Sequence, residues 1–331
     1  MRMLSNELTM QYELNVKKYQ YNRSNYYLET NKGKYILRKV NIPKEQVIFE
    51  YEVNEYIHEQ EFEQIAKICL NKKKVPYSIY KDKIYIMERY IDCQETDFKE
   101  VEDLKNITRV LAIFHKAGTG MKSQVRNIEN ASIKNIYEYF EKRHIESRKL
   151  RKRLAKLAQK TPFEIMFLKD YRVYEQLEKI ALQCISVEDS NKLIAVAKEN
   201  QTLIHNDYNY HAVSRVTKEH YVINNLDSCV YNIQIVDLAN LLTRIMQKNN
   251  WDIDLLKELI DIYNTYRPLS EAELRGLKAM LIFPEKYANI CSKYLNSKRR
   301  AHYNMFEVKW QNMLEYRDGQ LAAAYKIQEM L

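Results

Sequence analysis

Glycine is scarce in this sequence: it occurs 5 times among 331 residues, against an average usage of about 7%. A backbone that wraps closely around phosphate normally needs several neighbouring glycines, because only glycine lets the chain turn and approach so tightly. The sequence contains neither GxGxxG nor GxxxxGK[ST]. It therefore excludes a nucleotide site built on a glycine-rich cradle.

Cysteine pairs and long apolar runs are also missing. The cysteines are odd in number, and none forms a CxxC pair: Cys69, Cys93, Cys184, Cys229 and Cys291. This favours a reduced, intracellular protein without a disulfide framework or structural zinc. The N-terminal segment lacks an apolar signal core, and no run of about 18 apolar residues follows. We therefore expect no secretion, no transmembrane segment and no membrane partner.

Hydrophobic residues and positive charge are plentiful. Hydrophobic residues make up 46% of the chain, enough for a sizeable core, and the net charge is +9. The stretch from Arg143 to Lys160 is especially basic. It could bind phosphate polymers, but a solvated helix face is the interpretation that we favour.

The first ninety residues have the pattern of a small α+β lobe. Asn31-Lys32-Gly33 indicates a hairpin, and Pro43 opens a helical pattern that reaches about Phe62. Runs rich in tyrosine and β-branched residues predict strands at 12–16, 26–29, 35–40, 75–80 and 84–90. Residues 1–91 are thus predicted to form a five-stranded antiparallel sheet with one helix.

Residues 92–331 are predicted to form a larger, mostly helical lobe. Helical patterns cover 101–116 and 133–160, continue from Pro162 to 185, and resume at Val236. Ser270-Glu271-Ala272-Glu273 has the pattern of a capping box. Between them, residues 202–240 form a β insert of short strands and polar turns. The fold class is α+β with two lobes.

The insert carries the residues with chemical potential. His205 and Asp207 form an H-x-D pair, and Asn225 precedes the Asp237-Leu238-Ala239 segment by 12 residues. This arrangement resembles the catalytic core of the aminoglycoside phosphotransferase and choline kinase group, which has a protein kinase-like fold. The group's pattern is H-x-D-x-x-x-x-N, a hairpin, a metal-binding Asp and then D-L-A.

The closer resemblance is to CotS-type spore coat proteins within that group. It covers nearly the whole chain and is carried by Trp251, by YNTYRPLSEAEL, and by the segment around Phe283-Pro284-Glu285-Lys286. The resemblance implies synthesis in the cytoplasm of the mother cell, a final place in the spore coat, and other coat proteins as partners.

The same resemblance assigns roles in phosphoryl transfer, with ATP and Mg²⁺ as the implied cofactors. Asp207 matches the catalytic base, His205 matches the residue that braces its loop, and Asp237 has a structural role. The two metal positions hold Ala212 and Asn225. A methyl group binds no cation, and hard Mg²⁺ favours carboxylate over amide oxygen.

Other ligands could compensate for these two losses. Asp227 is retained and is the remaining candidate for holding a metal ion. Asn209 and His211 lie near the loop and are further substitutes.

The nucleotide-binding positions are changed as well. Arg38 stands where the group has a strand lysine, which keeps the charge but alters its reach and geometry. Glu50 and Glu52 are both candidates for the helix glutamate that pairs with this cation. The residues expected to line an adenine pocket between the lobes are Met87, Glu88 and Tyr90.

Together these changes favour a pseudokinase that acts in coat assembly through binding. The first alternative is an active ATP-dependent phosphotransferase for a small molecule, with Asp207 as base. The second is a nucleic-acid-binding protein that uses the basic stretch from Arg143 to Lys160. Magnesium-dependent turnover and salt-sensitive nucleic-acid binding would distinguish these alternatives.

Overall fold

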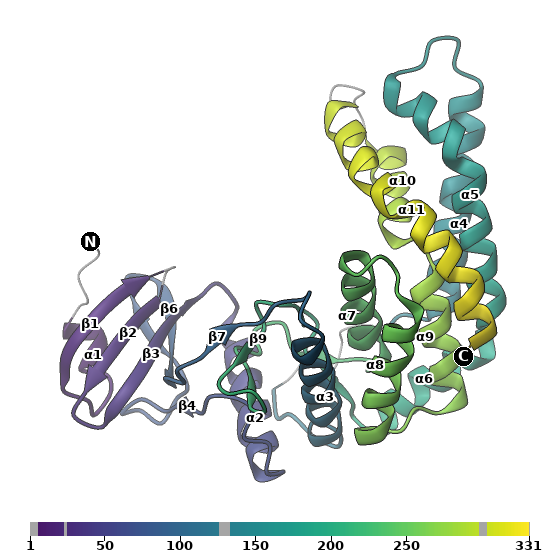
Figure 1. Ribbon diagram of the computed structural model, residues 1–331. Coiled ribbons are helices and arrows are strands. Elements are labelled where there is room, and N and C mark those ends of the chain that lie inside the picture. Colours follow the sequence, from purple (N-terminus) through teal and green to yellow (C-terminus); the bar gives the residue numbers. More distant parts are fainter. Residues whose placement is uncertain (1–5, 23–24, 126–132, 298–302, 331) are drawn as a thin grey trace. The chain divides into compact units, whose positions relative to one another are not determined.

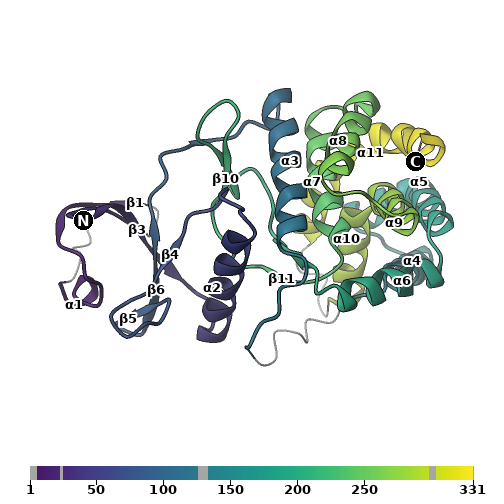
Figure 2. The same cartoon turned by 90° about the horizontal axis from the view of Figure 1, so that it is seen from below.

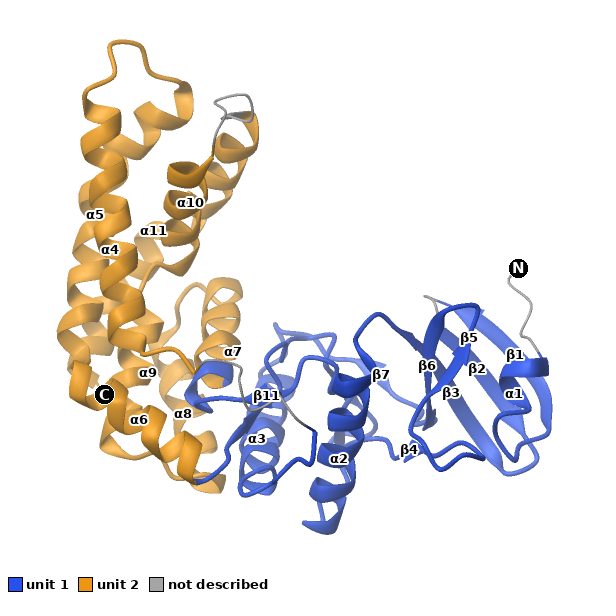
Figure 3. Cartoon of the chain, turned by 180° about the vertical axis from the view of Figure 1, so that it is seen from behind, with its two compact units in different colours: residues 1–132, 200–237 blue, residues 133–199, 238–331 orange. Residues whose placement is uncertain are grey.

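The computed structural model describes residues 6–22, 25–125, 133–297 and 303–330. It divides into two compact units (Figure 3): Met1–Ser132 with Asn200–Asp237, and Ile133–Glu199 with Leu238–Leu331. The first unit thus joins the N-terminal sheet to the β insert that carries the H-x-D pair. The predicted lobe boundary at residue 91 stays a prediction. The two compact units do not test it, because each of them combines two separate stretches of the chain.

The first unit begins with an antiparallel sheet, labelled in Figure 1. Its strands are β1 (Val16–Asn22), β2 (Asn25–Thr30), β3 (Gly33–Val40), β4 (Ile68–Cys69), β5 (Ser78–Tyr80) and β6 (Lys83–Arg89). The order is β1-β2-β3-β6-β4, and β5 pairs with β6. The α+β character and the antiparallel sheet confirm the predicted fold class, but the sheet has six strands rather than five.

The two faces of this sheet are covered by different helices. Helix α1 (Asn6–Thr9) supplies Leu8 to a core on one face, where it packs with Leu37 and Met87. Helix α2 (Lys44–Glu59) lies on the other face (Figure 2), where its Val47 packs among the buried residues of the opposite cluster. Because side chains alternate along a strand, this second face also receives every other residue of β3 and β6.

Three predicted elements of this unit need correction. Of the strand predicted over 12–16, only Val16 is in a strand, as the first residue of β1; Tyr12 is buried but lies in a turn before it. The strand predicted over 75–80 is limited to β5, and the two-residue β4 was not predicted. Short or polar strands give little periodic signal, so neighbouring strands rather than local pattern determine them.

The rest of the first unit consists of α3 (Val101–Ala117) and short strands. These strands are β7 (Gln94–Glu95), β8 (Leu203–Ile204), β9 (Val213–Arg215), β10 (Tyr221–Ile223) and β11 (Val230–Tyr231). Strands β10-β9-β7 form one small sheet, and β11 pairs with β8. The predicted helix at 101–116 and the predicted insert are therefore confirmed, and the pairing fixes both ends of the H-x-D loop.

The second unit is helical. Its helices are α4 (Ile136–Ala155), α5 (Pro162–Cys184), α6 (Val187–Glu199), α8 (Ile253–Tyr266), α9 (Glu271–Ile282), α10 (Glu285–Asn296) and α11 (Tyr303–Met330), while α7 (Ile235–Lys248) begins in the first unit. Edge-on and tilted aromatic rings packed around Trp310 fill its core. Both Thr161 and Ser270 form complete capping boxes, and the second confirms a prediction. Within the described residues, no helix is long and apolar enough to cross a membrane.

Candidate functional site

A buried arginine gathers three carboxylates in the first unit. Arg38 on β3 donates from Nη2 to Glu50 Oε1 at 2.7 Å, and from Nη2 and Nε to Glu88 Oε1 at 2.8 and 3.2 Å. Its Nη1 donates to the carboxylate of Asp227. Side-chain exposure is 11% for Arg38 and 1% for Glu50. We call these four residues the Arg38 cluster.

Strand register and helix packing assemble the Arg38 cluster. Arg38 pairs with Ile86 and Ile36 pairs with Glu88, so Arg38 and Glu88 are diagonal neighbours on the face covered by α2. Glu50 lies on the buried side of α2, and its Oε1 also accepts the Leu226 backbone N–H at 3.2 Å. That bond ties α2 to the chain segment that presents Asp227.

The electrostatics of the cluster are unbalanced, because one guanidinium faces three carboxylates. Burial, then the charges of Asp227 and Glu88, raise the pKa of Glu50 to about 8, although Arg38 opposes this. Burial by itself would lower the pKa of Arg38, but Glu88, Glu50 and Asp227 raise it well above its ordinary value. Near neutral pH we therefore expect Arg38 to be charged and Glu50 to bind a proton more readily than an ordinary glutamate.

The H-x-D loop is held by Asp237 at the start of α7. Its Oδ2 accepts the His205 backbone N–H at 2.6 Å, and its Oδ1 accepts that of Asn206 at 3.0 Å. His115 Nε2 lies 3.3 Å from the same Oδ2. Asn206 has a φ of 66°, a left-handed conformation that asparagine tolerates. The carboxylate thus fixes the loop that presents Asp207.

Asp207 itself is exposed. Asn209 Nδ2 donates to Asp207 Oδ1 at 2.8 Å, while the Asp207 backbone N–H donates to His205 Nδ1 at 3.3 Å. Burial lowers the pKa of His205, so the ring is neutral near pH 7. Such a ring can brace the loop as an acceptor while Asp207 remains open to solvent.

The residues present do not fit a magnesium ion. Ala212 is 4% exposed and offers no ligand atom, and the carboxylate of Asp227 is already paired with Arg38. Asn209, a predicted substitute, uses its side-chain oxygen to accept the His211 backbone N–H at 2.8 Å. In the part of the chain that the structure describes, no three Asp, Glu, His or Cys side chains gather in a way that could hold a metal.

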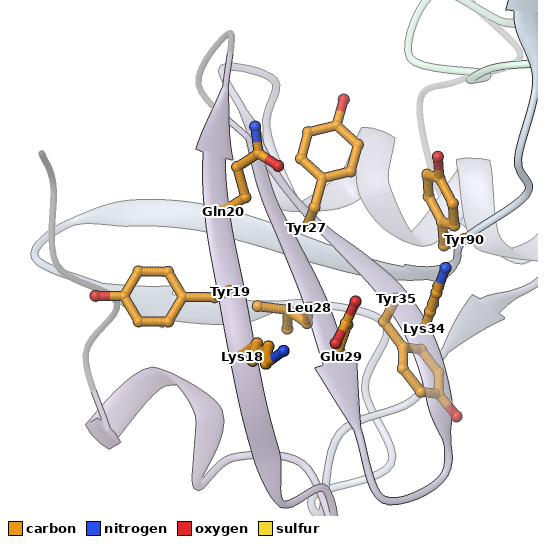
Figure 4. Close-up of a pocket in the computed structure, with 9 residues that line it drawn as sticks. All are labelled: Lys18, Tyr19, Gln20, Tyr27, Leu28, Glu29, Lys34, Tyr35 and Tyr90. Atoms are coloured by element: carbon orange, nitrogen blue, oxygen red, sulfur yellow. The ribbon is translucent and has the colours of Figure 1, made fainter.

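A tyrosine-lined hollow of about 350 Å³ lies along β1, β2 and β3. In Figure 4, Tyr27, Lys34 and Tyr90 stand next to one another in it. The Tyr27 and Tyr90 rings lie edge to face with their centroids 5.9 Å apart, and Lys34 Nζ lies 6.0 Å from the centroid of the Tyr90 ring. Of the three residues predicted to line an adenine pocket, Tyr90 alone is among those lining this hollow.

Met87 and Glu88 lie elsewhere. The Met87 side chain is fully buried in the core on the α1 face of the sheet, and Glu88 belongs to the Arg38 cluster. Glu52, the other candidate partner of Arg38, instead accepts hydrogen bonds from Ser123 and Gln124. Glu50 is therefore the α2 glutamate that reaches Arg38.

Comparison with known proteins now identifies the family. The family described as "Spore coat putative kinase YutH" matches residues 5–323. The chain belongs to this family. It is also similar to "Spore coat protein S" of Bacillus subtilis (strain 168), with 21% identity over 313 residues that cover 92% of this chain and 86% of the relative. The predicted resemblance to CotS-type spore coat proteins is confirmed.

Solved structures with the same fold are phosphotransferases. The aminoglycoside phosphotransferase of Alicyclobacillus acidocaldarius superposes with a TM-score of 0.80 at 18% identity, covering 100% of this chain and 98% of the other. Spectinomycin phosphotransferase APH(9)-Ia, solved with ADP and spectinomycin, has a TM-score of 0.58 at 13% identity and covers 98% of this chain and 97% of its own. At such identities the likeness shows the fold alone, and this chain therefore has the kinase-like fold of these phosphotransferases.

Proposed function

We propose that this chain is a pseudokinase that acts in spore coat assembly through binding. It is made in the cytoplasm of the mother cell and then joins other proteins in the coat. One observation carries the proposal: Asp227, the carboxylate left to hold a cation, is bonded to Arg38. Membership of a spore coat family supports the coat location.

The charge of the Arg38 cluster explains why ordinary catalysis is disfavoured. Phosphoryl transfer needs cations that neutralise the phosphates of the nucleotide. Arg38 already serves three carboxylates, so phosphates must compete with them for its donors. With Ala212 and Asn225 at the matched metal positions, no carboxylate is added that would attract Mg²⁺.

A nucleotide could still bind without metal. The hollow offers the rings of Tyr27 and Tyr90 for a flat, aromatic base, and Lys34 for negative charge. Two related folds were solved with nucleotides: spectinomycin phosphotransferase with ADP, and amicoumacin kinase with AMP-PNP and Ca²⁺. Metal-independent binding in this hollow would be consistent with a role as a binding protein.

Thermal-shift titration with ATP, with and without Mg²⁺, tests the proposal on the full chain. We expect either no shift or a shift that Mg²⁺ does not increase. A ligand at a hundred times its Kd stabilises by about 2.7 kcal/mol, so a magnesium-dependent gain would be measurable. Such a gain in the unaltered chain would overturn the pseudokinase assignment.

A restored ligand makes the test sharper. Asn225→Asp returns a carboxylate to the principal metal position, and Asn225→Ala is its matched control. We expect Asn225→Asp to gain a magnesium-dependent shift that neither Asn225→Ala nor the unaltered chain has. If Asn225→Asp gains nothing although it folds normally, the lost metal ligand is not what sets this site apart.

An active small-molecule phosphotransferase is the second candidate, and the exposure of Asp207 favours it. A base must reach the acceptor hydroxyl, and Asp207 is exposed on a loop fixed by Asp237. That candidate predicts magnesium-dependent ATP turnover that disappears in Asp207→Ala. The pseudokinase proposal instead predicts that Asp207→Ala fractionates with spores as the unaltered chain does.

A further inference from the structure

Helix α4 carries a dense and unpaired positive surface. Six cations fall within nine residues, and all are exposed: Arg148, Lys149, Arg151, Lys152, Arg153 and Lys156. Leu150 and Leu154, in the same stretch, are buried against the helical core. Among the described residues, none of the six forms an ion pair with a carboxylate. We call this set the basic face.

Helix stability alone explains only part of the basic face: the helix dipole favours Lys152 and Arg153 in the last turn of α4, but neighbouring cations also repel one another. Arg148 and Lys152, and likewise Lys149 and Arg153, are four residues apart on one helix. Like charges at this spacing repel each other, whereas alternating signs would stabilise the helix. The remaining contacts of the face are with neutral groups: Arg151 lies over the Tyr171 ring and Arg153 donates to the Leu295 carbonyl. An external anion would relieve the repulsion.

The first unit carries a surface of the opposite sign at the end of α2. Glu59 is the last residue of α2, and Glu61 and Glu63 follow it. All three are exposed, and none forms an ion pair within the described residues. The C-terminal end of a helix is itself partly negative, which makes acidic groups there unfavourable on local grounds. We call these three residues the acidic end.

We propose that copies of this chain associate by placing the basic face of one copy on the acidic end of the next. The two surfaces differ, so each bound copy keeps one surface of each kind free. Such a head-to-tail contact builds rings or open arrays rather than a symmetric dimer, which is how a layer can grow. This inference rests on the proposed assembly role but not on the state of the Arg38 cluster.

Charge complementarity within the chain is the reason for choosing a second copy as the partner. Proteins that bind single-stranded nucleic acid without sequence preference combine a basic groove with aromatic side chains on which bases stack. The exposed part of the basic face, residues 148–156, contains no aromatic residue. Single-stranded nucleic acid is therefore a poor match for the basic face, whereas the acidic end supplies carboxylates of the opposite charge.

Charge reversal with a matched control tests the contact by analytical ultracentrifugation. The variants are R148E/K149E/K152E/K156E, which makes the basic face net negative, and E59K/E63K, which makes the acidic end net positive. The control is K257E/K309E, which reverses two exposed lysines on α8 and α11 that form no ion pair in the described chain. At about 0.05 M salt, where screening is weak, we expect the unaltered chain and the control to self-associate. Each interface variant should weaken association by about tenfold or more.

Mixing the two interface variants gives the decisive arm. The reversed α4 of one variant faces the reversed α2 end of the other, so attraction returns in the mixture but not in either variant alone. Restored association that disappears at about 1 M salt would establish the contact. A chain that stays monomeric at low salt, or a mixture that fails to associate, overturns it.

Nucleic acid is tested in parallel. A salt-sensitive affinity for duplex RNA that is lost in R148E/K149E/K152E/K156E, without self-association, would assign the basic face to nucleic acid and refute the proposal. Failure here is separable from failure of the proposed function, because these measurements contain neither ATP nor Mg²⁺.

Discussion

Replacing Arg38 with Met should destabilise the first unit more than any other single exchange at the site. Methionine keeps much of the length of the side chain but removes the charge and every donor. Glu50 and Glu88, with side chains 1% and 7% exposed, would then face each other without a cation. Removing one partner of a buried ion pair costs about 3–5 kcal/mol.

The loss in the free energy of unfolding caused by Arg38→Met should be larger at high pH than at low pH. Without Arg38, the buried carboxyls can escape their mutual repulsion by taking up protons, which is easier at low pH. We therefore expect the full cost of Arg38→Met at about pH 8 and a markedly smaller cost at about pH 5. Asp227, with its side chain 32% exposed, contributes less because water screens it.

Urea unfolding of the full chain, followed by circular dichroism at both pH values, measures this. The matched control is Lys39→Met, because Lys39 is the next residue on β3, is half-buried, and forms no ion pair within the described residues. We expect the control to cost about 0.5 kcal/mol or less, as surface changes usually do. An Arg38→Met cost no larger than that of Lys39→Met, or one that grows as pH falls, would refute the reasoning.

Three further outcomes are expected, each measured by urea unfolding. Burial raises the pKa of Glu50 to about 8, so the folded chain keeps a proton at pH values where the unfolded chain has lost it. The free energy of unfolding should therefore fall between about pH 5 and 8. Glu50→Gln should make this fall smaller. Asp237→Asn should cost about 2–4 kcal/mol, because an amide oxygen cannot replace a carboxylate that accepts two backbone N–H groups; a cost near zero would deny its bracing role. Ser270→Ala should cost about 1 kcal/mol in the helical unit, since it removes the hydroxyl oxygen that accepts the Glu273 backbone N–H in the capping box, whereas Ser292→Ala, in the middle of α10, should cost less.

Local patterns predicted the parts of the fold whose causes are local. The β2–β3 hairpin follows from Asn31-Lys32-Gly33, and α2 follows from Pro43 and the apolar residues after it. The capping box at Ser270 was likewise readable from four residues. In each case the turn residue, the cap or the periodic face acts within a few positions, so the sequence contains the whole signal.

Strand β1 shows where local pattern fails. Its sequence, VKKYQYN, is mostly exposed and contains two adjacent lysines, so it has no apolar alternation. It is a strand because it pairs along its length with β2, at the edge of the sheet. Lysines on an edge strand also discourage pairing with other chains. The run of tyrosine and β-branched residues instead predicted a strand over 12–16, whereas Tyr12 packs as part of the turn leading into β1.

The Arg38–Asp227 pair was beyond the reach of local pattern because 189 residues separate its members. This pair gives one physical explanation for two features that lie far apart in the sequence: the arginine at position 38, and the use of the Asp227 carboxylate as its partner. A lysine ammonium is a point charge with three donors, whereas the planar guanidinium has five donors and can serve several carboxylates at once. Arg38 reaches Glu50, Glu88 and Asp227 together. An arginine at this position therefore supplies, from inside the protein, positive charge to a carboxylate that would otherwise be open to a cation from outside.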